Sequence, residues 1–269
     1  MNADHLDLFL FETSAPGAAA MHHAGVQHLL VDWEYMGKTE RQQGFDTEIA
    51  PQDRNTLRDI VRSTTGPVWC RINRSGEHTR REIEEAIEAG ASGLFLPMVQ
   101  HPSEVEAFLG MIDGRCESGI LVETTQAMTH LGSLAKFPLS RVYFGLNDFA
   151  ISRSAHFIFR AVLDGSVQRA REAFEGIPFG FAGVTAIDRG SPVPCAWLVE
   201  EMERLGCQFS FMRRSFRRDV RQVSPGELVD GVQAYWRQCR ARDPATRQSD
   251  HHRLHALLAE LDHADPTPA

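Results

Sequence analysis

Polar side chains that could do chemistry follow short apolar runs at intervals along this sequence. They are Glu12, Asp32, Glu34, Arg71, Asn73, Glu123, Asn147, Asp148, Arg213 and Arg214. If the runs are parallel strands of a barrel, these residues lie at the carboxyl ends of the strands, where barrel enzymes place their catalytic groups. A single acid there can equally be a helix cap or an ion-pair partner, but Arg71, Glu123 and Asp148 at three strand ends together favour a functional site.

These residue types suit the binding of a 2-oxo acid beside a metal ion. Two carboxylates on adjacent strand ends, Glu123 and Asp148, can hold a hard divalent cation such as Mg²⁺ and leave positions for water and substrate oxygens. The planar guanidinium of Arg71 would bind the substrate carboxylate. The cation would act as a Lewis acid and stabilise the enolate that forms when a carbon–carbon bond breaks.

Eight short apolar segments must position these residues. We predict strands at Leu8–Phe11, His28–Trp33, Val68–Ile72, Gly93–Leu96, Gly119–Val122, Val142–Phe144, Phe181–Val184 and Gln208–Met212. Most are nearly continuous apolar runs, as in strands buried on both faces of a parallel sheet. Helical patterns alternate with them: Thr79–Ala89 should place its acids away from its apolar side, and Ser103–Ile112 carries a capping-box pattern at its first residue.

This alternation predicts an α/β fold, either a closed barrel or an open doubly wound sheet. No Gly-x-Gly-x-x-Gly turn follows the first strand, which disfavours the open sheet. We therefore predict a (β/α)₈ TIM barrel over residues 1–240, with a C-terminal helical extension and loose tail over residues 241–269.

The extension contains an amphipathic segment, His251–Leu261, that we expect to pack on the barrel or on another subunit. Its His251 and His255 have the i, i+4 spacing of a zinc site, with His252 beside them. No acidic partner in a pocket is evident from the sequence, so we predict an ordinary exposed polar face.

Composition narrows the function classes. The 269 residues are 42% hydrophobic and carry a formal net charge of -8, a balance that disfavours nucleic-acid binding. The five cysteines form no Cys-x-x-Cys pair, and no apolar run reaches the roughly 18 residues of a membrane span. With no basic secretory signal at the first residues, we expect a cytoplasmic protein without nucleic-acid or membrane partners.

Several of these segments also resemble those of a known family. They are Val31-Asp-Trp-Glu34, Val68-Trp-Cys-Arg-Ile-Asn73, Glu88-Ala-Gly-Ala-Ser-Gly-Leu-Phe-Leu-Pro-Met98, Leu121-Val-Glu-Thr-Thr125 and Phe144-Gly-Leu-Asn-Asp-Phe149. In order and spacing, from about Leu8 to Arg218, the chain resembles the HpcH/HpaI aldolase/citrate lyase β family. Each motif is weak alone, but together they are fairly specific.

The resemblance implies a metal-dependent, class II-type aldolase that cleaves or forms a carbon–carbon bond of a 4-hydroxy-2-oxo acid through a metal-stabilised pyruvate enolate. It implies Mg²⁺ or Mn²⁺ on Glu123 and Asp148, with a pyruvate-type 2-oxo acid and an aldehyde as the small-molecule partners. The implied substrate-binding residues are Arg71, Asn73, Pro97, Asn147, Arg213 and Arg214. It also implies a homo-oligomer, a trimer or a hexamer.

The sequence departs from the family at the residue that follows the strand-two glutamate. Aldolases of the family that cleave hydroxy-oxo diacids have a histidine there for acid–base work, whereas this chain has Tyr35. The proton-transfer group is therefore open among Glu34, Asp32, Tyr35 and a metal-bound water, with Arg71 as the other catalytic residue.

Two other readings of the barrel stay open. One is a lyase or thioesterase acting on a CoA thioester, because the arginines of residues 213–218 could bind a diphosphate, although they could equally pair with surface acids or a subunit. The other is a non-catalytic barrel that serves as a binding subunit.

Overall fold

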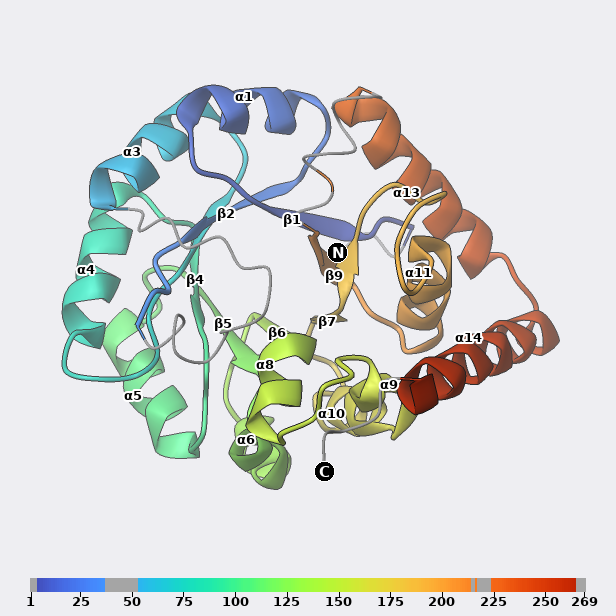
Figure 1. Ribbon diagram of the computed structural model, residues 1–269. Coiled ribbons are helices and arrows are strands. Elements are labelled where there is room, and N and C mark those ends of the chain that lie inside the picture. The colour runs from blue at the N-terminus through green and yellow to red at the C-terminus, as the bar shows by residue number, and fades with distance from the viewer. Residues whose placement is uncertain (1–3, 37–52, 214–215, 217–223, 265–269) are drawn as a thin grey trace.

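The computed structural model describes residues 4–36, 53–213, 216 and 224–264. Parallel strands form a nearly closed barrel, and helices surround it (Figure 1). The strands are β1 Asp7–Phe11, β2 His28–Asp32, β3 Val68–Arg71, β4 Gly93–Leu96, β5 Glu117–Val122, β6 Arg141–Phe144, β7 Phe179–Phe181, β8 Gly183–Val184 and β9 Phe209–Met212. The predicted α/β barrel is confirmed, with strand bounds within a few residues of those expected.

The barrel closes through β7 and β8, which only Ala182 separates. β7 pairs with β6, whereas β8 pairs with β9, so the segment spans the gap between the two ends of the sheet. Ala182 has φ 54, in the left-handed region that non-glycine residues seldom adopt, and this breaks the pairing there. The two short strands therefore occupy the place of the single predicted seventh strand.

Helices follow most of the strands. They are α1 Ala15–His23, α3 Arg54–Ser63, α4 Thr79–Ala89, α5 Pro102–Ile112, α6 Thr125–Thr129, α7 Leu131–Leu134, α8 Leu146–Ser152, α9 Arg160–Leu163, α10 Ser166–Ala173, α11 Cys195–Arg204, α13 Pro225–Arg240 and α14 Pro244–Ala264. None of the helices described is long and apolar enough to cross a membrane.

The core has two layers, one inside the barrel and one between the strands and the helices. The inner layer is aromatic: Trp69 and Phe95 are fully buried, with ring centroids 4.7 Å apart. Neighbouring glycines make room for these rings, because a Cβ on Gly93 would lie 2.7 Å from Trp69 and one on Gly119 would lie 2.4 Å from Phe95. The barrel interior is thus filled by side chains, and the carboxyl ends of the strands are left to form a site.

Three expectations about helices are corrected. α5 begins at Pro102, and the Glu104 side chain accepts hydrogen bonds from the backbone N–H groups of Gln100 and His101, so the predicted start at Ser103 was wrong. Glu82 of α4 is buried, because its carboxylate accepts a hydrogen bond from the backbone N–H of Asn73, just after β3. The expectation that the acids of this helix lie away from its packed side is therefore wrong for Glu82. α14 is also longer than the predicted segment.

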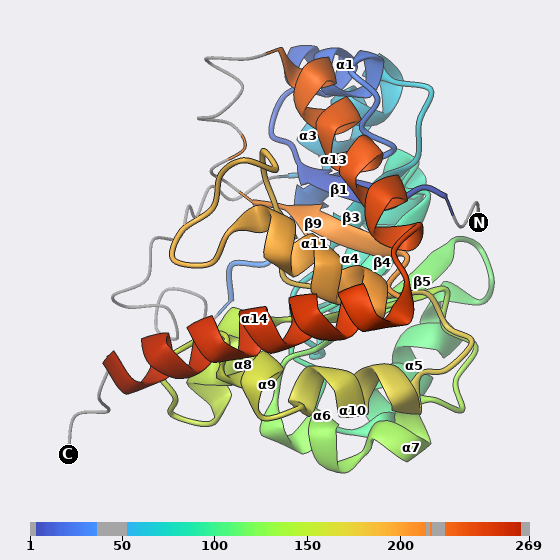
Figure 2. The ribbon, with the colours of Figure 1, turned by 90° about the vertical axis from the view of Figure 1, so that its right-hand side faces the viewer.

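α14 runs along the outside of the barrel against α11 and α9 (Figure 2). Leu254 and Leu258 are buried in this contact, and Arg160 of α9 forms an ion pair with Asp262 at 2.8 Å. The extension therefore packs on the barrel, as one of the two expectations had it. Its separation into residues 241–269 stays a prediction, and the predicted loose tail lies largely outside the described residues.

Candidate functional site

The carboxyl ends of β2 and β3 bring Asp32 and Arg71 together, since the two residues are register partners. Arg71 Nε and Nη2 donate to the two carboxylate oxygens of Asp32 at 3.0 and 2.7 Å, and Nη1 lies 3.3 Å from Glu34 Oε2. The guanidinium also lies over the ring of Phe11, 5.0 Å from its centroid. This two-point pairing fixes the plane of the guanidinium and directs its Nη1 edge toward Glu34.

Glu123 follows β5 and is almost completely buried. Its Oε1 accepts the backbone N–H of Met98 at 2.8 Å, and Met98 itself has φ 55, a strained value of the kind that clusters at functional sites. Gly145, just before α8, leaves space for the carboxylate, because a Cβ there would lie 2.2 Å from Glu123 Oε2. The hydrogen bond from Met98 and the space left by Gly145 thus both fix the position of the Glu123 carboxylate.

Asp148 lies in the first turn of α8, where it too is buried. Burial, together with the nearby carboxylates of Asp148 and Glu34, raises the pKa of Glu123 well above its usual value, against the opposing effect of Arg71. Asp32, Glu34 and Glu123 act on the charge of Arg71, and Asp148 lies near Glu123, so acids outnumber the arginine in this described group. A divalent cation fits this donor set, because hard cations prefer carboxylate oxygens and would offset the repulsion among them.

Asn73 is fully buried and positions the chain that follows β2. Its backbone N–H and side-chain amide donate to Glu82 of α4 at 2.9 and 2.7 Å. Its amide oxygen accepts the backbone N–H groups of Tyr35 and Met36 at 3.0 and 2.9 Å. These bonds give Asn73 a positioning role, whatever it contributes to substrate binding.

The remaining predicted site residues differ in their surroundings. Pro97 is buried, whereas Asn147 is exposed on α8. The Tyr35 side chain is 48% exposed although its backbone is anchored. Arg213 Nε donates to the carbonyl of Gly183 at 2.8 Å, and burial lowers the pKa of its guanidinium. Arg214 lies outside the described residues.

Glu12 also follows a strand, but its bonds are those of a local cap. Its carboxylate accepts the backbone N–H groups of Thr13 and Ser14 at 2.7 and 3.1 Å, just before α1. Gly17 of α1 packs directly against that carboxylate. These contacts support the interpretation of Glu12 as a helix-capping residue.

Three residues of the site were missed by sequence reasoning. Glu82 stands among the many acids of α4, and nothing in its spacing singles it out. Nothing in the residue type of Met98 or of its neighbours predicts its left-handed backbone conformation. Gly145 could have been recognised, because a glycine between a strand and a helix often marks a position where the chain closely approaches another group.

Comparison with solved structures sets this geometry in context. A citrate lyase from Burkholderia xenovorans superposes with a TM-score of 0.62 at 14% identity, covering 97% of this chain and 93% of the other. The citrate lyase beta subunit of M. tuberculosis, complexed with oxaloacetate and magnesium, gives 0.57 at 18%, covering 88% and 100%. The citrate synthase SbnG gives 0.61 at 14%, covering 87% and 95%. This chain shares their fold.

The fold expected from the family resemblance is therefore confirmed over nearly the whole length of the chain. Sequence comparison adds nothing further, since no protein-family model and no curated protein matches the chain. At these identities the likeness establishes the fold, and the chemistry has to be argued from the site.

Proposed function

We propose that this protein is a divalent-metal-dependent carbon–carbon lyase that cleaves or forms a 4-hydroxy-2-oxo acid. The observation that carries the proposal is the group of acids beside Arg71 and Glu123 at the carboxyl end of the barrel. Within this group we assign Glu123 and Asp148 as the metal ligands. The similar M. tuberculosis subunit is complexed with oxaloacetate, itself a 2-oxo acid, and with magnesium. That neighbour supports both the substrate class and Mg²⁺ or Mn²⁺ as cofactor.

The residues divide the work by their contacts. Glu123 and Asp148 would hold the cation, which supplies Lewis-acid polarisation of the oxo-acid oxygens when it is bound. Arg71, oriented by Asp32, would bind the substrate carboxylate through the guanidinium edge that faces Glu34. Met98 and Gly145 keep the Glu123 carboxylate aimed at the cation position.

Glu34 is the best placed of the protein groups for proton transfer. Its side chain is almost completely buried beside Arg71 and close to Glu123. Asp32 already uses both of its oxygens on Arg71, and Tyr35 is 48% exposed, whereas Glu34 is only 4% exposed. Glu34 would take the proton from the 4-hydroxyl group during cleavage and return it during condensation.

The test is pyruvate release from a panel of 4-hydroxy-2-oxo acids with different aldehyde portions, with and without EDTA. We expect release that requires Mg²⁺ or Mn²⁺ and that is lost in Asp148→Asn, which keeps the size of the side chain while removing the charge. Asp243→Asn is the control, because this exposed acid caps α14 far from the barrel mouth. Pyruvate release that persists in EDTA and in Asp148→Asn would contradict the proposal.

A CoA-thioester lyase or thioesterase is the second candidate, supported by the citrate lyases among the similar structures. Arg213, which directly follows β9, could bind the diphosphate group of CoA. CoA should raise the melting temperature only if this candidate holds, since a ligand that binds the native state stabilises it. No shift with CoA, together with pyruvate release, would exclude it.

We also propose that the protein works as a homo-oligomer, a trimer or a hexamer, in the cytoplasm. Light scattering on the purified protein gives the mass directly. A monomer at working concentrations would contradict the assembly without affecting the proposed reaction.

A further inference from the structure

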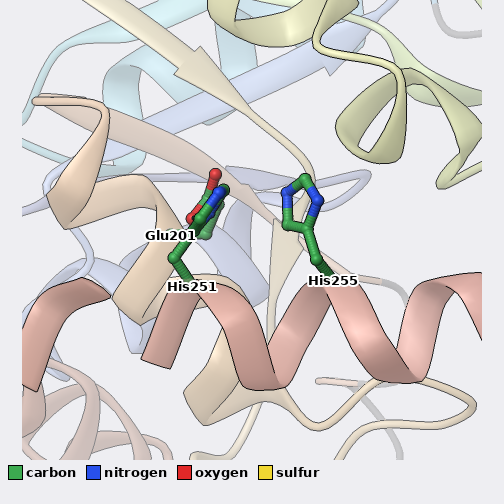
Figure 3. Close-up of side chains that lie close together, drawn as sticks. All are labelled: Glu201, His251 and His255. Carbon is green, nitrogen blue, oxygen red and sulfur yellow. The ribbon is translucent and has the colours of Figure 1, made fainter. Parts of the chain in front are cut away.

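A second cluster of metal-ligating side chains lies on the outside of the barrel, between α11 and α14. It consists of Glu201 on α11 and of His251 and His255 on α14, whose side chains converge in Figure 3. His251 Nδ1 lies 3.0 Å from Glu201 Oε2, and one ligand atom from each of the three residues lies within 4.8 Å of the others. The expectation that these histidines form an exposed polar face, without an acidic partner, was therefore wrong.

The helices hold the cluster in place. Residues four apart on a helix point to the same side, so His251 and His255 both face α11. Leu254 and Leu258, between and beyond them, are completely buried and anchor that side of α14. Glu201 is itself almost completely buried, although it lies on a helix at the outer layer of the fold.

The three residues are of types that bind zinc, and the carboxylate is held in a fixed orientation. Arg204 Nε and Nη2 donate to the two oxygens of Glu201 at 2.9 and 2.7 Å, which orients the carboxylate beside His251. Imidazole nitrogens and carboxylate oxygens are common zinc ligands.

A helix-docking network is the ordinary alternative, and it accounts for only part of the cluster. Arg204, Glu201 and His251 do form such a network through their hydrogen bonds. His255 does not join it: its Nε2 is buried and has no hydrogen-bond partner among the described residues. A buried polar atom without a hydrogen-bond partner is destabilising, and a bound metal ion would satisfy it.

The cluster also borders a pocket, which leaves room for a fourth ligand. Both histidines, Glu201 and Arg204 line it, and so do Asp164 and Gln168 from the α9–α10 region. A tetrahedral zinc ion with two histidines and one carboxylate keeps an open position for water or another ligand. The pocket provides space for such a position.

We propose that Glu201, His251 and His255 form a zinc site that fastens α14 to α11, separate from the proposed cation site at the barrel mouth. Nitrogen ligands select Zn²⁺ over Mg²⁺, which prefers oxygen ligands only. Tetrahedral ligands lie about 3.3 Å apart at normal zinc distances, so the pair at 3.0 Å is nearly in place and His255 has to turn by a small amount.

The test is titration of the full-length protein with Zn²⁺ in excess Mg²⁺, followed by calorimetry. The informative comparison is His255→Ala against His252→Ala, because His252 is the exposed neighbour on the same helix. His255→Ala leaves the bonds of Glu201 to Arg204 and His251 intact, so the variant should fold. Both variants keep the barrel-mouth acids, and zinc bound there cancels in the comparison.

We expect the wild type and His252→Ala to bind one zinc ion more than His255→Ala, or to bind it at least about tenfold more tightly. With Co²⁺ in place of zinc, the same two proteins should show the intense visible absorption of tetrahedral cobalt, and His255→Ala should not. Equal zinc binding by His255→Ala and His252→Ala, or no zinc binding by the wild type at micromolar concentrations, would overturn the proposal. Pyruvate release in Mg²⁺ should be the same in both variants, so this test is independent of the proposed reaction.

Discussion

At the scale of single residues, Arg71 carries the sharpest prediction, because its role depends on a fork of donors. Lysine keeps the charge but cannot donate to both oxygens of Asp32 while facing Glu34. Arg71→Lys should lose about 1.5–3 kcal/mol of interaction with the substrate carboxylate, or roughly 10–150-fold in kcat/KM. Steady-state kinetics on the best substrate of the panel measure this loss.

The matched control is Arg115→Lys. Arg115 makes the same two-point pairing, with Glu84 at 2.7 Å for both nitrogens, but on the surface. Exposed ion pairs contribute little to stability, and this pair is not part of the proposed site, so the variant should keep full activity. If Arg71→Lys were as active as Arg115→Lys, Arg71 would not bind the substrate.

The site residues differ in how far the sequence could predict them. Arg71, Glu123 and Asp148 stand out because a charged residue after an apolar strand is conspicuous. Glu82 and Glu201 are hidden among the ordinary acids of amphipathic helices, and only the packing of those helices reveals that they are buried. Partners that meet through tertiary contact leave no local signal in one sequence.

At the scale of elements, the approach of α8 to β5 depends on Gly145. Gly145→Ala would place a Cβ 2.2 Å from Glu123 Oε2 and force that side chain to move. We expect a loss of metal-dependent activity with a stability decrease of about 1–3 kcal/mol. Gly110→Ala is the control: its Cβ would meet nothing within 4 Å in α5, where alanine is the better helix former by up to about 1 kcal/mol.

Urea unfolding and Mg²⁺-dependent pyruvate release, measured on both variants, separate the two effects. Gly145→Ala should lose activity at urea concentrations too low to unfold it. Gly110→Ala should be as active as the wild type. An active Gly145→Ala variant would mean that the position of the Glu123 carboxylate is not critical.

Helix boundaries show why elements are easier to predict than their ends. The start of α14 after Asp243 follows a known pattern, a capping acid followed by Pro244, but only the later segment His251–Leu261 was predicted as helical. α5 offers two capping patterns within a few residues, and the one with proline at the first helical position is used. Strand positions were predicted better, since burial on both faces leaves a continuous apolar run.

At the scale of the whole molecule, closure of the barrel could not be predicted from periodicity. An open sheet has the same alternation of strands and helices, and the closing step occurs at Ala182, whose sequence is ordinary. The hydroxyl of Tyr143 on β6 donates to the Ala182 carbonyl, and this bond across the gap accompanies the change of partner from β6 to β9. Closure of the barrel therefore depends on contacts between segments that are far apart in the sequence.

The opposite end of the barrel holds a buried ion network that makes stability depend on pH. Asp7 at the start of β1 lies 3.1 Å from Arg141 and 3.4 Å from His28. Burial acts to raise the pKa of Asp7, but hydrogen bonds and charges from His28 and Arg141 outweigh it, so the pKa is lowered from 3.8. A lowered folded-state pKa stabilises the protein above the unfolded value, and this stabilisation is lost as pH falls through the folded value.

Asp7→Asn should therefore lower the free energy of unfolding by about 2–4 kcal/mol at neutral pH, because the partly buried Arg141 loses its carboxylate. The difference from the wild type should shrink as the pH falls below 3.8 and through the lowered folded-state pKa of Asp7, because the carboxyl group is then protonated in both states. Asp4→Asn is the control, since Asp4 is largely exposed beside Arg240 and its loss should cost under about 1 kcal/mol at any pH. Urea unfolding across this pH range tests the prediction. A difference in unfolding free energy between Asp7→Asn and wild type that stayed constant with pH would show that the charge of Asp7 does not stabilise this end of the barrel.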